Sequence, residues 1–120
     1  MGATVYKILT AAAWDEACRE GVFHGAPVDL ADGYIHFSTA AQVRETAGKH
    51  FAGLADLVLV GFDADGFDAD GFGVALKWEP SRGGALFPHL YAALDPALAI
   101  EVAPLPLGPD GRHRFPETIP

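Results

Sequence analysis

The sequence predicts an α+β fold with a mostly antiparallel or mixed sheet. Its 120 residues suit one domain spanning residues 1–120. Helical patterns come early in the chain and strand patterns come late. The chain shows no series of strands separated by crossover helices, which disfavours a doubly wound parallel fold.

The composition is typical of a globular protein, with 50% hydrophobic and 20% charged residues. The chain has 8 Lys and Arg against 16 Asp and Glu, which gives a net charge of −8. This balance disfavours a broad nucleic-acid surface and an anionic-membrane surface, both of which need excess basic residues. No apolar stretch is long enough to span a bilayer, and the N-terminal residues do not resemble a secretory signal. We therefore expect a cytoplasmic protein.

The chain begins with a predicted strand and a capped helix. Residues 4–9 have a strand pattern. Thr10 can cap a helix over residues 11–20, and Gly21 suits its end. The inward stripe of this helix is expected to contain Trp14, Ala17 and Cys18.

Cys18 is the only cysteine, so it cannot form an internal disulfide or a cysteine-based zinc site. We expect it to be buried as a small hydrophobic residue. Residues 22–32 are expected to connect the first helix to the next strand, with a turn at Asp32 and Gly33.

A short strand over residues 34–38 leads into the second helix. Thr39 and Gln42 have the spacing of a capping box. The apolar face of this helix is predicted to contain Val43, Ala47 and Phe51, and Gly53 is expected to close it.

The second half of the chain predicts several strands. Residues 57–62 form an apolar run, and residues 72–78 are its expected antiparallel partner. A direct repeat, Phe-Asp-Ala-Asp-Gly, lies between them, and it lacks the spacing of an EF-hand calcium loop. Residues 86–90 form a strand that Pro88 assigns to an edge or a bulge. Residues 99–103 form the last strand, and the Pro-rich segment 104–120 is expected to be irregular.

One candidate site lies on the strand before the second helix. Strand alternation places Tyr34, His36 and Ser38 on one face and leaves the apolar Ile35 and Phe37 for the core. The helix that follows could receive an anion at its N-terminus. The alternative is a half-exposed strand followed by a capped helix.

A second candidate site lies around His89. His89 and Tyr91 share a face, while Leu90 points to the core. Histidine can move a proton near neutral pH, and Glu79, beside Trp78, could stabilise a cationic transition state. The alternatives are a structural His–Tyr pair and a surface carboxylate.

His36, His89 and Glu79 have the ligand types that zinc or iron prefers. No local His-x-x-x-His pair supports a metal site, so none is predicted. The catalytic candidates are therefore His36, His89 and Glu79. The ligand-binding candidates are Tyr34, Ser38, Thr39, Gln42, Trp78 and Tyr91.

Two strings carry a resemblance to a bacterial family, the domain of unknown function 952: residues 32–39, Asp-Gly-Tyr-Ile-His-Phe-Ser-Thr, and residues 86–91, Leu-Phe-Pro-His-Leu-Tyr. Other matching positions are Tyr6-Lys-Ile, Trp14, Gln42-Val43, Thr46-Ala47, Trp78-Glu79 and Gly83-Gly84. That family is grouped by fold similarity with the ADP-ribosyltransferases. The grouping implies a split, mixed sheet with two main helices and a cleft that grips NAD.

The resemblance also implies roles for particular residues. His36 matches the strand histidine that holds a ribose, Tyr91 the aromatic ring that stacks on nicotinamide, and Glu79 the carboxylate that steadies the oxocarbenium ion. The sequence contains no complete His–Tyr–Glu or Arg–Ser–Glu signature.

Three functions therefore stay open. The first is an enzyme that cleaves NAD or handles ADP-ribose, with NAD as a substrate and no assigned cofactor. The second is a non-catalytic module that binds a nucleotide or another small ligand in the same cleft. The third is a hydrolase or isomerase that works through His36 and His89. In each case the partner is a small molecule, and the oligomeric state is left open.

Overall fold

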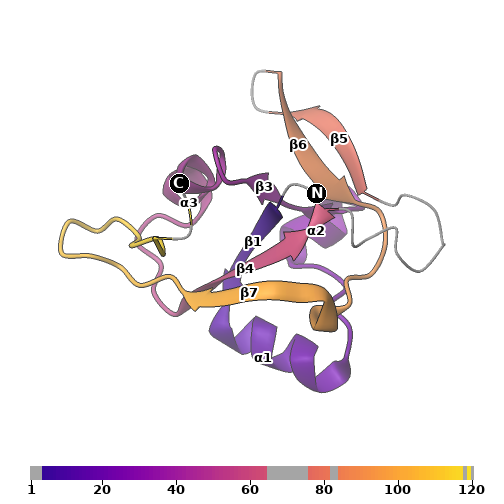
Figure 1. Ribbon diagram of the computed structural model, residues 1–120, viewed down its shortest axis with the longest axis horizontal. Helices are drawn as coiled ribbons and strands as arrows, with labels where there is room; N and C mark the ends of the chain where they lie inside the picture. The colour runs from indigo at the N-terminus through magenta and orange to yellow at the C-terminus, as the bar shows by residue number, and fades with distance from the viewer. Residues whose placement is uncertain (1–3, 65–75, 82–83, 118, 120) are drawn as a thin grey trace.

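Two antiparallel sheets form the framework of the computed structural model, which describes residues 4–64, 76–81, 84–117 and 119 (Figure 1). The four-stranded sheet has the order β3 (Ser38–Thr39), β1 (Thr4–Thr10), β4 (Leu57–Asp63), β7 (Ala99–Pro104). The three-stranded sheet has the order β2 (Ile35–His36), β6 (Ala85–Leu90), β5 (Leu76–Ser81). The predicted α+β class is confirmed. Every strand pair in the described residues is antiparallel, so the parallel part of a mixed sheet does not occur there.

Helix α1 (Ala11–Glu20) has the predicted bounds and caps. The Ala13 N–H donates to Thr10 Oγ1 at 3.1 Å. Gly21 ends the helix in the left-handed region, with φ of +76°, which glycine adopts without steric cost. Local capping chemistry is sufficient to define this helix.

The segment 22–32 contains a helix that the sequence analysis missed, α2 (Pro27–Asp32). Pro27 stands at a first-turn position where its fixed φ suits a helix, and Gly33 ends the helix in the left-handed region. Asp29 Oδ2 accepts the Ala26 N–H at 2.7 Å, which satisfies a donor that the helix itself leaves free. The expectation of a plain connecting segment was therefore wrong.

Helix α3 (Val43–His50) begins four residues after the predicted cap Thr39, and its N-cap is Gln42. The Thr39 N–H donates to Gln42 Oε1 at 3.0 Å, which is one half of the predicted capping box. Val43 and Ala47 are buried as predicted. The helix ends at His50, before Gly53, and a short 3-10 helix (Pro96–Leu98) precedes β7.

The core lies on both faces of the four-stranded sheet. One face carries Val5, Leu9, Val60 and Phe62, and it packs against α1 and against apolar residues of the three-stranded sheet. The other face carries Tyr6, Ile8, Leu57 and Leu59, and it packs against α3 and the C-terminal segment. Leu105 and Ile119 of that segment are buried, so the irregular end of the chain closes this half of the core.

Two strand predictions were wrong. Residues 76–81 pair with β6, whereas the partners of β4 are β1 and β7. Pro88 lies in the central strand of its sheet, not at an edge or a bulge. The Phe37 N–H donates to the Pro88 carbonyl at 3.0 Å, so the missing N–H of Pro88 faces the point where the β2 ladder ends. Residues 65–71 of the repeat lie outside the described residues.

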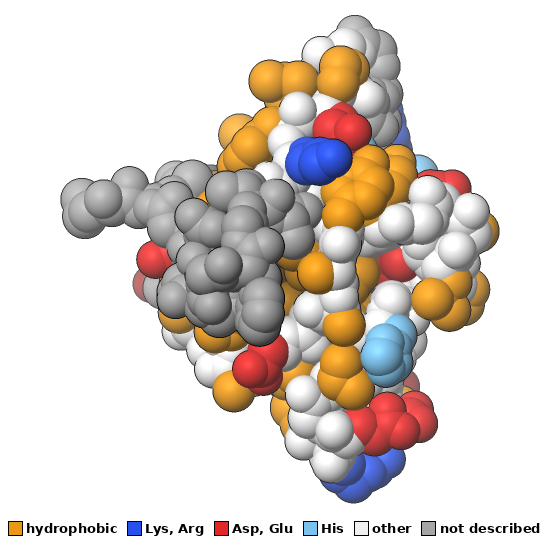
Figure 2. Space-filling model, turned by 90° about the vertical axis from the view of Figure 1, so that its right-hand side faces the viewer, with side chains coloured by type: hydrophobic (Ala, Val, Ile, Leu, Met, Phe, Trp, Pro, Cys, Tyr) orange, Lys and Arg blue, Asp and Glu red, His pale blue; other side chains and the backbone are white. Residues whose placement is uncertain are grey.

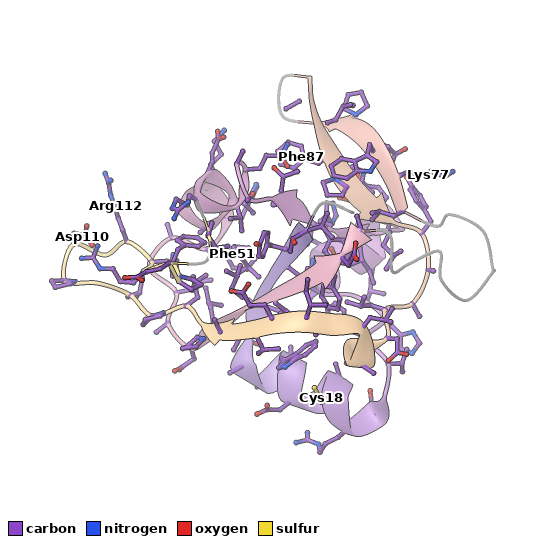
Figure 3. The ribbon with its side chains drawn as sticks, in the orientation of Figure 1. Cys18, Phe51, Lys77, Phe87, Asp110 and Arg112 are labelled. Carbon is purple, nitrogen blue, oxygen red and sulfur yellow. The ribbon has the colours of Figure 1, made fainter. Side chains whose placement is uncertain are left out.

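Cys18 is exposed on α1, where Figure 3 labels it, so its expected burial was wrong. Trp14 and Ala17 alone supply the buried positions of that helix. On the side of the molecule shown in Figure 2, acidic side chains lie at separate places and do not form one continuous patch. None of the described helices is long and apolar enough to cross a membrane.

Leu59 tests how far the central strand β4 determines stability. Its side chain is fully buried, so Leu59→Ala should lower the free energy of unfolding by about 3 kcal/mol through lost burial and a new void. Leu54→Ala, at a site 49% exposed, is the matched control and should cost less than about 1 kcal/mol. Urea unfolding measures both values, and equal losses would contradict this packing.

Candidate functional site

The chain passes from one sheet to the other at Phe37, and two histidines lie side by side next to this crossing. In the β2–β6 ladder Ile35 is paired with Leu90 and His36 with His89. Ile35, Phe37 and Leu90 are buried, as the alternation predicts. The two imidazole rings lie 5.5 Å apart between centroids. Two strings 53 positions apart in the sequence therefore meet at one place.

Ser38 belongs to β3, in the other sheet, but it lines the same cavity of about 830 Å³ as His36 and His89. It is buried, and its hydroxyl lies 2.8 Å from Thr46 Oγ1. Tyr34 stays with the histidines. Its ring stacks on His89 at 4.1 Å and lies 4.6 Å from His36 and 5.1 Å from Tyr91. An aromatic cluster thus surrounds the paired histidines.

Glu79 orients His89. Its Oε1 lies 2.8 Å from His89 Nδ1 and accepts the Tyr91 hydroxyl at 2.6 Å. These hydrogen bonds, from Tyr91 first and then from His89, lower the pKa of Glu79. The same bond to Glu79, helped by desolvation, raises the pKa of Tyr91 to about 12. The Glu79 carboxylate therefore stays ionised and the Tyr91 phenol stays protonated near neutral pH. The hydrogen bond at Nδ1 fixes the orientation of the His89 ring.

Asp29 orients His36. This carboxylate is almost fully buried, with a side chain 1% exposed. It lies 2.9 Å from Lys7 Nζ, and its Oδ1 lies 2.6 Å from His36 Nδ1. It also accepts the backbone N–H of His36 at 3.0 Å and that of Ala26 at 2.7 Å. Asp29 thus joins β1, β2 and the start of α2 at one point.

The electrostatics of this group follow from its burial. Desolvation acts to raise the pKa of Asp29, but the hydrogen bonds from His36 and the charge of Lys7 outweigh it and lower the pKa to about 2. Desolvation lowers the pKa of Lys7, and Asp29 opposes that change. The other ring nitrogen of His36, Nε2, lies 2.9 Å from Asp32 Oδ2.

A cavity of about 830 Å³, here called the main cavity, reaches both histidines. Residues of both sheets and of all three helices line it. Its polar lining includes Lys7, Asp32, His36 and His89. Its aromatic walls include Phe51 and Phe87, which are labelled in Figure 3, and Phe37. The volume and the mostly apolar walls are typical of sites for small molecules.

His89 lines this cavity, and its two ring nitrogens have different surroundings. Among the described residues, no buried side-chain nitrogen or oxygen lacks a hydrogen-bond partner. The recorded hydrogen bond of His89 uses Nδ1, and none is recorded for Nε2 within the described part of the chain. Nε2 is therefore not fully enclosed, and His89 is one of the residues that line the main cavity. His89 therefore has one anchored nitrogen and one available for chemistry.

The remaining predicted residues fall into two groups. Tyr34 and Tyr91 line a smaller cavity of about 290 Å³, which neither His36 nor His89 lines. Neither cavity is lined by Glu79, Trp78, Thr39 or Gln42.

Trp78 shares a face with Pro88, opposite to Lys77 and His89, so it points away from the histidines. The Gln42 side chain donates to the Leu86 carbonyl at 2.7 Å and accepts from Thr39, so it braces β6 against the start of α3. The predicted anion position at that helix start does not line the main cavity.

Sequence reasoning missed Asp29, Lys7 and Asp32. A local signal existed for Lys7, because it interrupts an apolar strand over residues 4–9. Asp29 follows Pro27 at the third position of a short helix, which is a favoured place for a carboxylate. Within the described ranges, no three His, Cys, Asp or Glu side chains are grouped closely enough to hold a metal ion.

Asp29→Asn tests the buried charge group. At pH 7 the variant should lose about 3 kcal/mol of unfolding free energy, because Lys7 is left buried without its partner. The pKa of Asp29 is depressed in the folded state from 3.8 to about 2, so its stabilisation is present above pH 4 and is lost as the pH falls toward 2. The gap between wild type and variant should narrow by about 2 kcal/mol over that range. Urea unfolding of both proteins at several pH values measures this difference. A difference in unfolding free energy that does not change with pH would contradict the lowered pKa of Asp29.

Gly25→Ala tests the space beside Asp29. Gly25 has φ of +127°, and an added Cβ would lie 2.8 Å from the Asp29 Cβ. We expect a loss of about 2 to 3 kcal/mol in unfolding free energy from strain and displacement of Asp29. Gly53→Ala, with φ of +75° and open space around the new Cβ, is the control and should lose about 1 kcal/mol. Equal losses in thermal or urea unfolding would show that Asp29 is not displaced.

Comparison with known proteins gives a family and a solved relative. The family model described as Protein of unknown function (DUF952) matches residues 8–102, which include His36, Glu79 and His89. The crystal structure of protein CC0527 from Caulobacter crescentus is 48% identical and superposes with a TM-score of 0.85, covering 92% of this chain and 93% of that one.

The solution NMR structure of CC0527 is 49% identical with a TM-score of 0.77, covering 91% of this chain and 90% of that one. No curated protein matches the chain. The matched residues span most of the sequence and both histidine-containing strands, so the chain belongs to the DUF952 family.

Proposed function

We propose that the main cavity binds a nucleotide of the ADP-ribose type, with NAD as the substrate, and that His89 moves a proton there. The observation that carries this proposal is the convergence of His36 and His89 on one cavity of about 830 Å³, with His89 anchored through Nδ1 alone among the described residues. The ligand would be the small-molecule partner of the chain.

The chemistry of the lining suits the parts of such a nucleotide. Aromatic rings of Phe37, Phe51 and Phe87 can contact a base. The carboxylate of Glu16, which also lines the cavity, can accept a hydrogen bond from a ribose hydroxyl. The resemblance to ADP-ribosyltransferases implies a split sheet, and the division of the strands into two sheets supports the proposal, although every described strand pair is antiparallel and the sheets are not mixed. His36 lies on β2, and the resemblance gives it the role of the ribose-holding histidine.

Glu79 takes a different role from the one the resemblance implies. Its carboxylate accepts from Tyr91 and contacts His89 Nδ1, and it does not line the main cavity. A carboxylate so placed would orient His89 and stabilise its protonated form, as the third member of a catalytic triad does. It would not itself contact an oxocarbenium ion.

Proton transfer through His89 gives a balanced cleavage step. A water oxygen forms a bond to the anomeric carbon of the ribose while the bond from that carbon to the nicotinamide nitrogen breaks. The bonding electron pair returns to the nicotinamide ring, and the water proton passes to His89 Nε2. Glu79 stabilises the imidazolium that results.

The experiment measures ADP-ribose binding by calorimetry and nicotinamide release from NAD. His89→Gln should abolish release and weaken ADP-ribose binding by about tenfold, the value of one strong hydrogen bond. His113→Gln is the matched control, because His113 bonds to the Leu54 carbonyl and lies outside the main cavity. This variant should behave as wild type.

Each other outcome has a definite meaning. Binding without release would make the chain a non-catalytic nucleotide-binding module. Absence of ADP-ribose binding would overturn the nucleotide proposal. The His89–Glu79 pair would then favour the third of the functions left open by the sequence, a histidine-dependent hydrolase or isomerase acting on another metabolite.

A further inference from the structure

Asp32 is hydrogen-bonded to Nε2 of His36, and both residues line the main cavity. It is the last residue of α2, and its Oδ2 lies 2.9 Å from His36 Nε2. Its side chain is 46% exposed, against 1% for Asp29 on the other ring nitrogen. Both Asp32 and His36 line the main cavity, whereas Asp29 does not. Asp29 is therefore a permanent partner of His36, while Asp32 is placed where a ligand can replace it.

The two hydrogen bonds of the His36 ring determine which protonation state it needs. Carboxylate oxygens only accept, so His36 can donate to Asp29 and Asp32 together only when both of its ring nitrogens carry a proton. Lys7, Asp29, His36 and Asp32 then carry alternating charges that sum to zero. If an anionic oxygen takes the place of Asp32 on His36 Nε2, it can accept the same hydrogen bond and restore the same balance of charges.

Rotation of one side chain is enough to vacate the position. No hydrogen bond other than the one to His36 is recorded for the Asp32 carboxylate within the described residues. Its exposure leaves room for other rotamers, and the space beside the next residue is open, because a Cβ added to Gly33 would meet nothing within 4 Å. The contacts of Asp29 with Lys7 and with the His36 backbone are independent of this movement.

We propose that His36 Nε2 is a binding subsite for an anionic oxygen of the ligand, and that Asp32 occupies this subsite in the free chain as an internal competitor. The proposal deepens the proposed function and rests on it for the use of the main cavity. It names a phosphate or carboxylate oxygen as the group that must displace Asp32. Binding to the free chain is weakened because the ligand competes with a tethered carboxylate.

The test compares anion binding with and without Asp32. Inorganic phosphate and acetate are titrated separately while the His36 ring signals are followed by NMR. Asp32→Ala should bind phosphate about tenfold more tightly than wild type, because a charged hydrogen bond no longer has to be broken. Asp32→Asn, which keeps an acceptor oxygen without the charge, should lie between the two. Phosphate binding tighter than acetate identifies a phosphate subsite, and the reverse order identifies a carboxylate subsite.

Asp15→Ala is the matched control. It removes the same charge from an exposed position on α1 that does not line the main cavity. A gain shared by Asp15→Ala would be a general charge effect and would overturn the proposal, as would the absence of any gain in Asp32→Ala. The gain must also disappear when His36→Gln is added to Asp32→Ala, since persistence would place the anion elsewhere. Thermal midpoints verify that each variant is folded.

ADP-ribose separates this proposal from the proposed function. If Asp32→Ala gains phosphate affinity while no variant binds ADP-ribose, the anion subsite stands and the nucleotide proposal fails. If wild type binds ADP-ribose and Asp32→Ala binds it no more tightly, the nucleotide proposal stands and the role of Asp32 as competitor fails.

Discussion

One buried carboxylate, Asp29, determines how the two sheets meet. Burying an ionised group is costly unless it is paired and hydrogen-bonded, and Asp29 satisfies this requirement with groups from three segments of the chain. Lys7 comes from the four-stranded sheet, His36 from the three-stranded sheet, and Ala26 from the start of α2. Strand β2 pairs with β6 along one edge only, so the backbone N–H of His36 on the other edge needs a different acceptor. Asp29 provides that acceptor. Any change at Asp29 therefore acts on the fold and on the orientation of His36 together.

The two histidines have different hydrogen-bond partners, so they are suited to different roles in the site. His36 has a carboxylate at each ring nitrogen, so it is suited to hold charge and position an oxygen. His89 has a carboxylate at Nδ1 only, which leaves Nε2 for proton transfer. Tyr34 separates the two roles structurally, since its ring packs against both imidazoles and fixes their planes. The exposed side of the cluster is braced by Glu79 and Tyr91.

Local patterns in the sequence predicted much of this arrangement. The cap at Thr10, the stop at Gly21 and the alternation around His36 and His89 depend on nearest neighbours, and the structure agrees with each. Contacts between residues far apart in the sequence could not be predicted from these local patterns. The Asp29–Lys7 contact joins residues 22 positions apart, and strand alternation does not reveal that Ser38 crosses into the other sheet. The prediction for Pro88 was wrong because a central strand can contain proline where the ladder with one neighbour has already ended. This condition is met because β2 is only two residues long, which the sequence pattern did not show.

A crystal structure of the chain with ADP-ribose bound tests the central claim most directly, namely that a site built on Asp29 presents His36 and His89 to a ligand in the main cavity. The account predicts a phosphate oxygen of the ligand within hydrogen-bond distance of His36 Nε2, with Asp32 turned away. It also predicts that the contacts of Asp29 with Lys7 and His36 are unchanged, and that His89 Nε2 faces the ribose. A ligand bound outside the main cavity, with Asp32 still on His36, would contradict it.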